Sequence, residues 1–410
     1  MALSVSPLAP ENFPVLPVVP GVRFAAGCTG MRYRNRDDLL LAELAPGTVV
    51  AGVFTRSLTA SAPVHWCRAV AKRGKGRAIV VNAGNANTFT GRDGVAAVKT
   101  TAAAAAKLLG CAAADVFVAS TGIIGQKLPV ETVTATLPTL QSTLQASGWE
   151  KAARAIMTTD TFPKGASARA KIGGVTVTIA GFAKGSGMIA PDMATMLAFV
   201  FTDAALPPKV LQQLLHEGTD RSFNSITVDS DTSTSDTLLL AATGKAANKK
   251  IARAGDPALK DFRAKLDAVL LDLAQQVVKD GEGAQKFVEI RVSGAASPAA
   301  ARKIGLAIGN SPLVKTAIAA ADANWGRIVM AIGKAGEKAD RDKLKVRVGG
   351  VLIAAKGGPV PDYDEAPVTQ HMQGKDILIE VDVGVGKSKA TIWTCDLTHG
   401  YIDINGSYRS

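Results

Sequence analysis

The chain carries two kinds of hydrophobic pattern. Short runs of β-branched and apolar residues, bounded by glycine-containing turns, predict strands over residues 48–54, 77–81, 116–119, 175–180, 197–201, 238–241, 287–292, 377–383 and 390–394. Between them, alanine- and leucine-rich stretches with apolar residues at helical spacing predict helices over residues 95–109, 129–145, 207–217, 258–279 and 312–318. The pattern therefore predicts an α/β protein throughout.

The order of these elements limits the architecture without deciding it. Strands and helices do not alternate strictly enough to require a doubly wound parallel sheet, and a layered sandwich of sheets covered by helices fits equally well. A length of 410 residues allows a large core and favours two large units over one.

No membrane or export segment is predicted. The longest apolar window, residues 193–201, is far shorter than the roughly 20 residues that a spanning helix needs. The N-terminus has no basic residue before Arg23, which fits neither a secretory signal nor a transit peptide. We therefore expect a cytoplasmic protein that does not bind membranes.

The composition of the chain limits the classes of ligand, metal site and catalytic base that we expect. The net charge is +12, but the basic residues are scattered among acidic ones and form no stripe interleaved with aromatics, so we expect anionic small molecules rather than nucleic acid as ligands. Four cysteines and four histidines occur, and none has the spacing of zinc ligands. Free thiols, no metal site and a catalytic base other than histidine are the resulting expectations.

Two segments resemble ligand-binding loops, but each lacks residues that the loop motif requires. GVGKS at 384–388 matches the end of a phosphate-binding loop, but Val381 stands where that loop requires glycine, and a hairpin turn explains the segment better. DSDTSTSD at 229–236, the acidic loop, has Thr234 and Leu240 where a calcium loop requires glycine and glutamate. Its polar side chains either fold back on their own backbone or position a nearby active site.

The most informative segment is KGSGMIAPDMATML at 184–197, a loop shaped by glycine and proline that runs into an apolar strand. Threonine is common at the start of a strand. In a tight loop, however, the Thr195 hydroxyl can attack the preceding Ala194 carbonyl, and hydrolysis of the resulting ester cuts the chain. The freed α-amine has an ordinary pKa of about 7.7–8.0 and can act as the base for its own hydroxyl. The residues alone thus allow two interpretations of the segment, an ordinary strand start or a self-cleaving chain with an N-terminal threonine as nucleophile.

This segment resembles, without departure, the self-cleavage signature of the ArgJ family, the ornithine acetyltransferases of arginine biosynthesis. Family-like segments recur along nearly the whole chain: NAGNAN at 82–87, STGIIG at 120–125, MTTDT at 157–161, RSFNSITVD at 221–229, DGEGA at 280–284, ANWGR at 323–327 and the final residues 401–410. The resemblance implies a layered sandwich of β-sheets and helices, similar to the DmpA/ArgJ-like fold of N-terminal-nucleophile type.

The resemblance also implies roles for individual residues. Thr195 corresponds to the nucleophile and Ala194 to the residue before the cut, while Thr121 and Gly122 correspond to an oxyanion hole that stabilises the charge of a tetrahedral intermediate. The amino-acid substrate is expected to bind a set with both charge signs and several hydrogen-bonding groups: Thr158, Lys184, Thr195, Glu282, Asn405 and Ser410. The last two predict an ordered C-terminus folded into the site.

The implied activity is a ping-pong transfer of the acetyl group from N²-acetylornithine to glutamate through acetyl-Thr195. It needs no cofactor, and some family members also accept acetyl-CoA as a donor, which the residues of this chain do not decide. The implied fragments, an α chain of residues 1–194 and a β chain of residues 195–410, stay together with two copies of each.

Two alternatives stay open from the residues alone. One is an N-terminal-nucleophile aminopeptidase or amidase of similar fold, which delivers the acyl group to water. The other is a non-catalytic basic binding protein in which the bond between Ala194 and Thr195 never opens.

Overall fold

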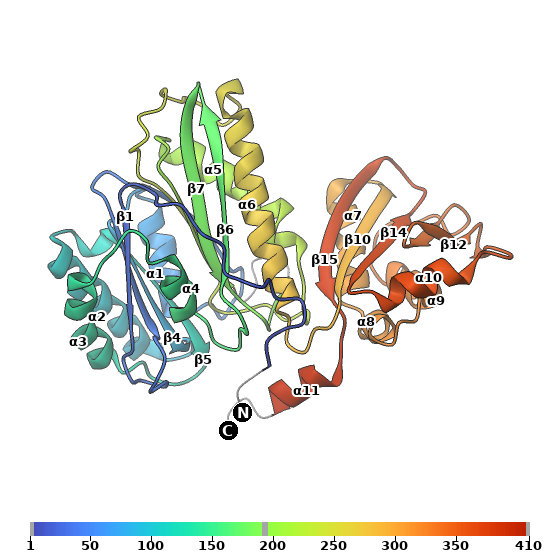
Figure 1. The fold of residues 1–410 in the computed structure, drawn as a ribbon, viewed down its shortest axis with the longest axis horizontal. Helices are drawn as coiled ribbons and strands as arrows, with labels where there is room; N and C mark the ends of the chain where they lie inside the picture. The colour runs from blue at the N-terminus through green and yellow to red at the C-terminus, as the bar shows by residue number, and fades with distance from the viewer. Residues whose placement is uncertain (1–3, 191–195, 407–410) are drawn as a thin grey trace.

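The computed structural model describes residues 4–190 and 196–406, which form two lobes joined side by side (Figure 1). The first lobe contains two sheets. A four-stranded sheet has the order β1-β2-β4-β5, with β1 Val22–Gly27, β2 Leu39–Leu44, β4 Ala78–Asn85 and β5 Val116–Ile123. A five-stranded sheet has the order β3-β9-β8-β7-β6, with β3 Val49–Phe54, β9 Thr237–Ala242, β8 Leu197–Thr202, β7 Val175–Lys184 and β6 Lys164–Ile172.

The two sheets pack face to face because alternate side chains of a strand point to opposite faces. On β8, Phe199 and Phe201 point toward the four-stranded sheet, where the ring of Phe201 lies 5.2 Å from that of Phe24. Ala198 and Val200 point the other way, into a second hydrophobic cluster. The five-stranded sheet is therefore buried on both faces.

Helices cover the outer faces of this sandwich and close its sides. One outer face packs on α2 Gly91–Leu109 and α3 Val130–Ser142, and the other on α5 Pro208–Arg221 and α6 Lys260–Lys279. At one side α1 Ala62–Ala71 contacts β3 and β5, and at the other α4 Trp149–Ala155 contacts β1 and β7. The result is a four-layered arrangement of helix, sheet, sheet and helix.

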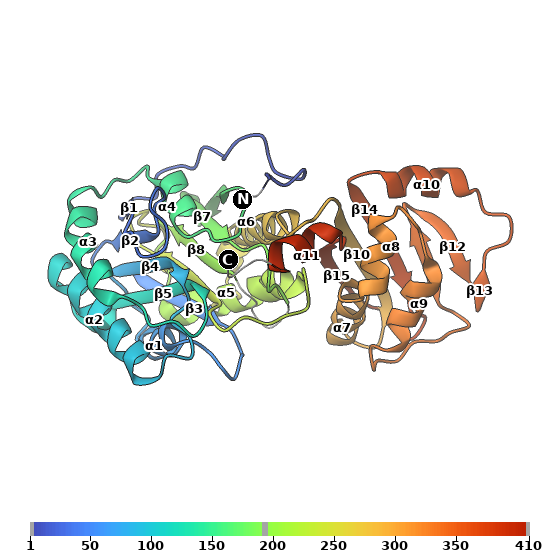
Figure 2. The ribbon, with the colours of Figure 1, turned by 90° about the horizontal axis from the view of Figure 1, so that it is seen from below.

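The second lobe is one six-stranded sheet with helices packed on it. Its order is β13-β12-β11-β14-β10-β15, with β10 Phe287–Ala295, β11 Lys345–Val348, β12 Val351–Ala355, β13 Gly358–Pro359, β14 Asp376–Asp382 and β15 Ser388–Cys395. The helices are α7 Pro298–Gly309, α8 Pro312–Ala319, α9 Trp325–Gly333 and α10 Glu365–Gln373, which share a hydrophobic cluster with the sheet. The last helix, α11 His399–Gly406, leaves this lobe and lies against the first one (Figure 2).

The hairpin predicted at 384–388 is wrong. This segment joins β14 to β15, but β10 lies between these two strands, parallel to β14 and antiparallel to β15. The connection therefore crosses over a strand from elsewhere in the chain. Local turn residues cannot reveal that, because the intervening strand comes from almost a hundred residues upstream.

The predicted α/β layered sandwich is confirmed, and each predicted strand and helix overlaps an observed one. Among the elements that were not predicted, β6 has a weak local pattern. In β6, charged or polar residues alternate with alanine and glycine, so the strand lacks the β-branched and aromatic residues that mark most strands. It nevertheless pairs along its whole length with β7.

Several expectations from composition can be compared with the described residues. All four cysteines are free. Within residues 4–190 and 196–406, no group of three or more acidic, histidine or cysteine side chains could hold a metal ion, and no helix is long and apolar enough to cross a bilayer.

Candidate active site

One cavity of about 240 Å³ collects the predicted site residues. It lies where the ends of β5 and β7 meet the acidic loop and α11. Six candidates from distant parts of the chain line it: Thr121, Gly122, Thr158, Lys184, Glu282 and Asn405. The other three, Ala194, Thr195 and Ser410, lie outside the described residues.

Thr121 and Gly122 reach the cavity because β5 runs parallel to β4 and ends beside it. Gly122 pairs with Gly84 and has a φ of +133°. A Cβ atom at this position would lie 2.3 Å from the Gly84 carbonyl carbon, so only glycine allows the two strands to approach this closely. This approach positions the Thr121–Gly122 peptide at the cavity wall.

Lys184 is the last residue of β7, and its ammonium group connects two hydroxyls of the cavity. Its Nζ donates to Thr158 Oγ1 at 2.8 Å and to Thr121 Oγ1 at 3.3 Å. A threonine hydroxyl both accepts and donates. Because the Thr121 oxygen accepts from Lys184, its hydrogen is directed elsewhere, which suits a donor to developing negative charge.

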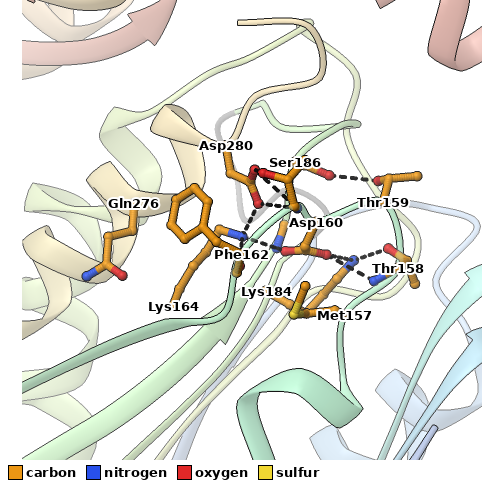
Figure 3. Close-up of polar contacts among 12 residues, drawn as sticks. Met157, Thr158, Thr159, Asp160, Phe162, Lys164, Lys184, Ser186, Gln276 and Asp280 are labelled. Carbon is orange, nitrogen blue, oxygen red and sulfur yellow. Dashed lines mark hydrogen bonds and ion pairs between the residues drawn. The ribbon is translucent and has the colours of Figure 1, made fainter. Parts of the chain in front are cut away.

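A buried ion network lies behind Lys184 (Figure 3). Asp160 Oδ2 lies 3.8 Å from Lys184 Nζ, and its Oδ1 accepts from Lys164 Nζ at 2.7 Å. Lys164 also donates to Asp280 Oδ2 at 2.6 Å. The side chains of Asp160, Lys164 and Asp280 are all buried. Backbone amides of Gly185 and Thr158 complete the partners of Asp160. Each buried charge thus faces an opposite charge, which such charges require.

Burial and the neighbouring charges shift the pKa values of both Asp160 and Lys184. Burial opposes ionisation of Asp160, but the Lys164 and Lys184 ammonium groups outweigh it and hold the pKa of this carboxyl well below its usual range. Burial lowers the pKa of Lys184 below that of an ordinary lysine, and Asp160 offsets the effect only in part. Lys184 is therefore a cation that loses its proton more readily than a surface lysine.

Glu282 supplies the opposite charge in the cavity. Its amide donates to the Ser186 carbonyl at 2.9 Å, and its Oε2 accepts from Asn405 Nδ2 at 2.7 Å. Gly187 leaves room for the carboxylate, since a Cβ there would lie 2.4 Å from Oε2. Burial raises the pKa of Glu282, and the hydrogen bond from Asn405 opposes that rise.

Helix α11 is held in place by hydrogen bonds from Thr398, just before the helix, and from Tyr401 within it. Thr398 Oγ1 donates to the Gly283 carbonyl at 2.7 Å, and the Tyr401 hydroxyl donates to Asp229 Oδ2 at 3.2 Å. Gly283 has a φ of +76°, and a Cβ there would lie 2.5 Å from the Tyr401 nitrogen. The C-terminal helix can therefore pack closely enough to bring Asn405 into the cavity.

Comparison with known proteins shows the family of this chain. The model of the ArgJ family matches residues 23–410. This chain belongs to the ArgJ family. The "Arginine biosynthesis bifunctional protein ArgJ" of Gluconobacter oxydans is 59% identical over 408 residues, covering 100% of this chain and 96% of the relative. The protein of the same name from Bradyrhizobium diazoefficiens is 56% identical over 413 residues and is covered completely.

A solved ArgJ structure is also similar. The crystal structure of the Bacillus halodurans arginine biosynthesis bifunctional protein shares 38% identity and a TM-score of 0.50, covering 52% of this chain and 100% of the solved one. The fold of this ArgJ-family chain therefore has a counterpart among known structures over about half of its length.

Some residues that line the cavity of this ArgJ-family chain were not among the predicted site residues. Ser233, Thr234 and Ser235 of the acidic loop line the cavity, together with the apolar side chains of Ile124 and Met188. The composition of the acidic loop did indicate a role near the active site as one possibility, because the loop is rich in side chains that bind backbone groups. The apolar pair gave no such indication, since hydrophobic residues beside a strand or in a glycine-rich loop are ordinary.

Proposed function

We propose that this ArgJ-family chain is a self-cleaving acetyltransferase that moves the acetyl group of N²-acetylornithine to glutamate. One observation carries the proposal: the Thr121 hydroxyl, the Lys184 ammonium and the Glu282 carboxylate line one small cavity. The β7–β8 ladder pairs Lys184 with Leu197, two residues after Thr195. Leu197, at the start of β8, therefore lies beside Lys184, which lines this cavity.

Self-cleavage begins when the Thr195 hydroxyl attacks the Ala194 carbonyl carbon. The acyl group moves from nitrogen to oxygen, and water then hydrolyses the ester to give a carboxylate on Ala194 and a free amine on Thr195. That amine accepts the hydroxyl proton of Thr195 in the acetyl-transfer reaction. The cut thus produces an amine that can act as the catalytic base. A histidine is then not needed for this role in a chain that has only four.

Acetyl transfer then takes two steps at one nucleophile. Thr195 Oγ attacks the acetyl carbonyl of N²-acetylornithine, and the Thr121 hydroxyl and Gly122 N–H stabilise the oxyanion. The C–N bond breaks and ornithine leaves with a proton from the Thr195 ammonium. The glutamate amine next attacks the acetyl ester and loses a proton to Thr195, giving N-acetylglutamate and the free enzyme.

Charge complementarity supports one binding site for both amino acids. Both substrates carry an α-carboxylate, which the Lys184 ammonium can bind with help from Thr158 and Asn405. N²-acetylornithine carries a distal ammonium, which suits Glu282, and Ser410 completes the proposed set. The apolar side chains of Ile124 and Met188 offer a surface for the acetyl and methylene groups.

The proposed fragments, residues 1–194 and 195–410, share one sheet. β8 and β9 of the second fragment lie between β3 and β7 of the first, and both interfaces are continuous ladders. Separating the fragments would expose these strand edges and the core beneath them. We infer that they stay together after the cut, and that two of each form the active assembly.

Acetyl-CoA is proposed as a second donor, which the word "bifunctional" in the names of the relatives supports. Label from [¹⁴C]acetyl-CoA should appear in N-acetylglutamate when glutamate is the only amino acid present. Absence of label with an enzyme that uses acetylornithine would restrict the activity to acetyl exchange.

The proposal is tested by intact-mass measurement of the purified protein and by product analysis. We expect two fragments divided between Ala194 and Thr195, glutamate-dependent release of ornithine, and an acetyl adduct on Thr195 when glutamate is omitted. Thr195→Ala should remain one chain and have no activity. Acetate as the main product, whatever the glutamate concentration, would indicate the amidase instead, and a wild-type chain that stays whole and inactive would indicate the binding protein.

A further inference from the structure

Two neighbouring threonines, Thr158 and Thr159, contact the two opposite charges of the cavity. Thr158 Oγ1 accepts from Lys184 Nζ at 2.8 Å, and the Thr159 hydroxyl is hydrogen-bonded to the Glu282 carboxylate. All four residues line the cavity. The cation and the anion that the proposed function assigns to the two ends of N²-acetylornithine are therefore bound by adjacent positions of one chain segment.

The direction of the hydrogen bonds at Thr159 follows from its partners. An ionised carboxylate only accepts, so the single hydroxyl hydrogen of Thr159 points to Glu282. The Thr159 oxygen lies 2.7 Å from Ser186 Oγ, and Ser186 is then the donor in this contact (Figure 3). The backbone closes the set, because the Glu282 amide donates to the Ser186 carbonyl at 2.9 Å. Ser186, Thr159 and Glu282 thus form a ring of contacts that fixes the carboxylate.

Asp160 fixes the segment that carries the two threonines. Its Oδ2 accepts from the amide of Thr158 at 3.0 Å, and its Oδ1 accepts from the amide of Gly185 at 2.6 Å. Gly185 directly follows Lys184 in the chain, and the Asp160 side chain is buried. The segment is therefore tied to the end of β7. The separation between Lys184 and Glu282 is set by packed backbone and not by mobile side chains alone.

A second cavity, of about 500 Å³, lies on the other side of Glu282. Thr159 and Glu282 line both cavities, so these two residues lie between the two spaces. A substrate side chain longer than that of ornithine has room beyond Glu282, and steric exclusion alone does not limit its length. Selection for length then requires a charge that is held at a fixed position.

We infer that Thr159 is a specificity-determining residue, which positions the Glu282 carboxylate relative to Lys184 and so selects the length of the diamino acid that the site accepts. With the α-carboxylate of the substrate at Lys184, a distal ammonium one methylene group farther away is paired less well with Glu282. Glutamate, whose distal group is a carboxylate, gains nothing from this contact. The inference rests on the proposed function and deepens it.

The test compares Thr159→Val with Thr159→Ser in the full chain. Valine keeps the shape of threonine but has no hydroxyl, whereas serine keeps the hydroxyl. The acetyl donors are N²-acetylornithine, N²-acetyllysine, which is one methylene group longer, and N²-acetylnorvaline, which lacks the distal ammonium. Glutamate is the acceptor in each assay. Thr139→Val, at an exposed position of α3, is the matched control.

For Thr159→Val we expect KM for acetylornithine to rise about tenfold and kcat to stay within about threefold, because a hydrogen bond to a charged binding group is lost. The preference for acetylornithine over acetyllysine and over acetylnorvaline, measured as the ratio of kcat/KM values, should fall about tenfold. KM for glutamate should stay within about twofold, since Glu282 does not bind its side chain. Thr159→Ser and Thr139→Val should keep the wild-type preference.

A second variant, Ser186→Ala, removes the donor to Thr159 and leaves the Thr159 hydroxyl in place. It should shift the preference in the same direction by a smaller factor, and it tests the same ring of contacts if the valine variant does not fold. Circular dichroism and thermal unfolding identify the folded variants.

The outcomes separate this inference from the proposed function. Unchanged donor preference in folded Thr159→Val, or in Ser186→Ala if only that variant folds, would overturn the selective role and leave the acetyltransferase proposal intact. An equal rise in KM for acetylornithine and for glutamate would also overturn it, since Thr159 would then support the cavity only in a general way. A wild-type chain that transfers no acetyl group from acetylornithine to glutamate would instead remove the proposed function on which the inference rests.

Discussion

The Asn405 side-chain amide donates a 2.7 Å hydrogen bond to the Glu282 carboxylate, although the two residues are 123 positions apart in the chain. Glu282 follows α6, beside the first lobe, while Asn405 is carried by the last helix, which returns from the second lobe. The contact therefore joins the segment after α6 to the last helix at the cavity. It makes α11 a wall of the candidate site.

Removal of this contact should weaken substrate binding. In Asn405→Ala we expect KM for acetylornithine to rise about tenfold, the equivalent of about 1.4 kcal/mol for one hydrogen bond to a charged group. The kcat should stay within about threefold, because the reacting atoms are not touched. Ile402→Ala, which truncates an exposed side chain of the same helix, is the control and should leave both constants unchanged.

Loss of the Thr121 hydroxyl should act on the chemical step. Thr121→Ala removes one of two proposed donors to the oxyanion, so kcat should fall about 10²–10³-fold with little change in KM. Thr121→Ser keeps the hydroxyl and should retain most of the activity. Loss of substrate affinity with normal kcat in the alanine variant would instead place Thr121 among the binding residues.

The lowered pKa of Lys184 predicts a pH effect on binding. Raising the pH removes the ammonium charge, and because burial has moved the pKa down, the loss occurs below the ordinary lysine value of about 10.4. We expect kcat/KM for acetylornithine to decline on the alkaline side. In Lys184→Arg, whose guanidinium stays charged, this decline should move to higher pH, even if the overall rate is lower. An unchanged alkaline limb in the arginine variant would assign the titration to another group.

The buried network should contribute strongly to stability. Lys164→Met leaves Asp160 and Asp280 without their shared cation, and we expect the free energy of unfolding to fall by about 3–5 kcal/mol. Lys343→Met, which breaks an exposed pair with Asp340, should leave the free energy of unfolding nearly unchanged, because solvent screens this pair. Urea unfolding in a Thr195→Ala background measures both in a single uncut chain, and equal losses would show that the buried network adds nothing special.

The same network predicts a response to acid. The pKa of Asp160 is depressed in the folded protein, so its stabilising contribution is present above the unfolded value of about 3.9 and is lost as pH falls through the lower folded value. Asp280, whose pKa is raised mainly by burial, acts in the opposite sense. The unfolding free energy of the Thr195→Ala chain should therefore decline below about pH 4, and Asp160→Asn should weaken that decline.

The sequence by itself determined the elements with strong periodicity and the segment that carries the proposed chemistry. The apolar run of β8 and the amphipathic pattern of α6 are local properties, because side-chain period and chain conformation are coupled within a few residues. The loop before Thr195 was recognisable because its glycine, proline and threonine residues lie close together in the chain. Thr121, Lys184 and Glu282 entered through resemblance, since no local pattern joins them.

Only the tertiary structure decided what these residues contact. The insertion of β10 between β14 and β15, the hydrogen bond from Asn405 to Glu282, and the grouping of Lys164 between Asp160 and Asp280 all join segments far apart in the chain. Such contacts depend on strand register and on how the layers pack, which the local sequence leaves open. The acidic loop shows the difference: its composition allowed two interpretations, and the position of Asp236 against the Met196 amide favours one of them.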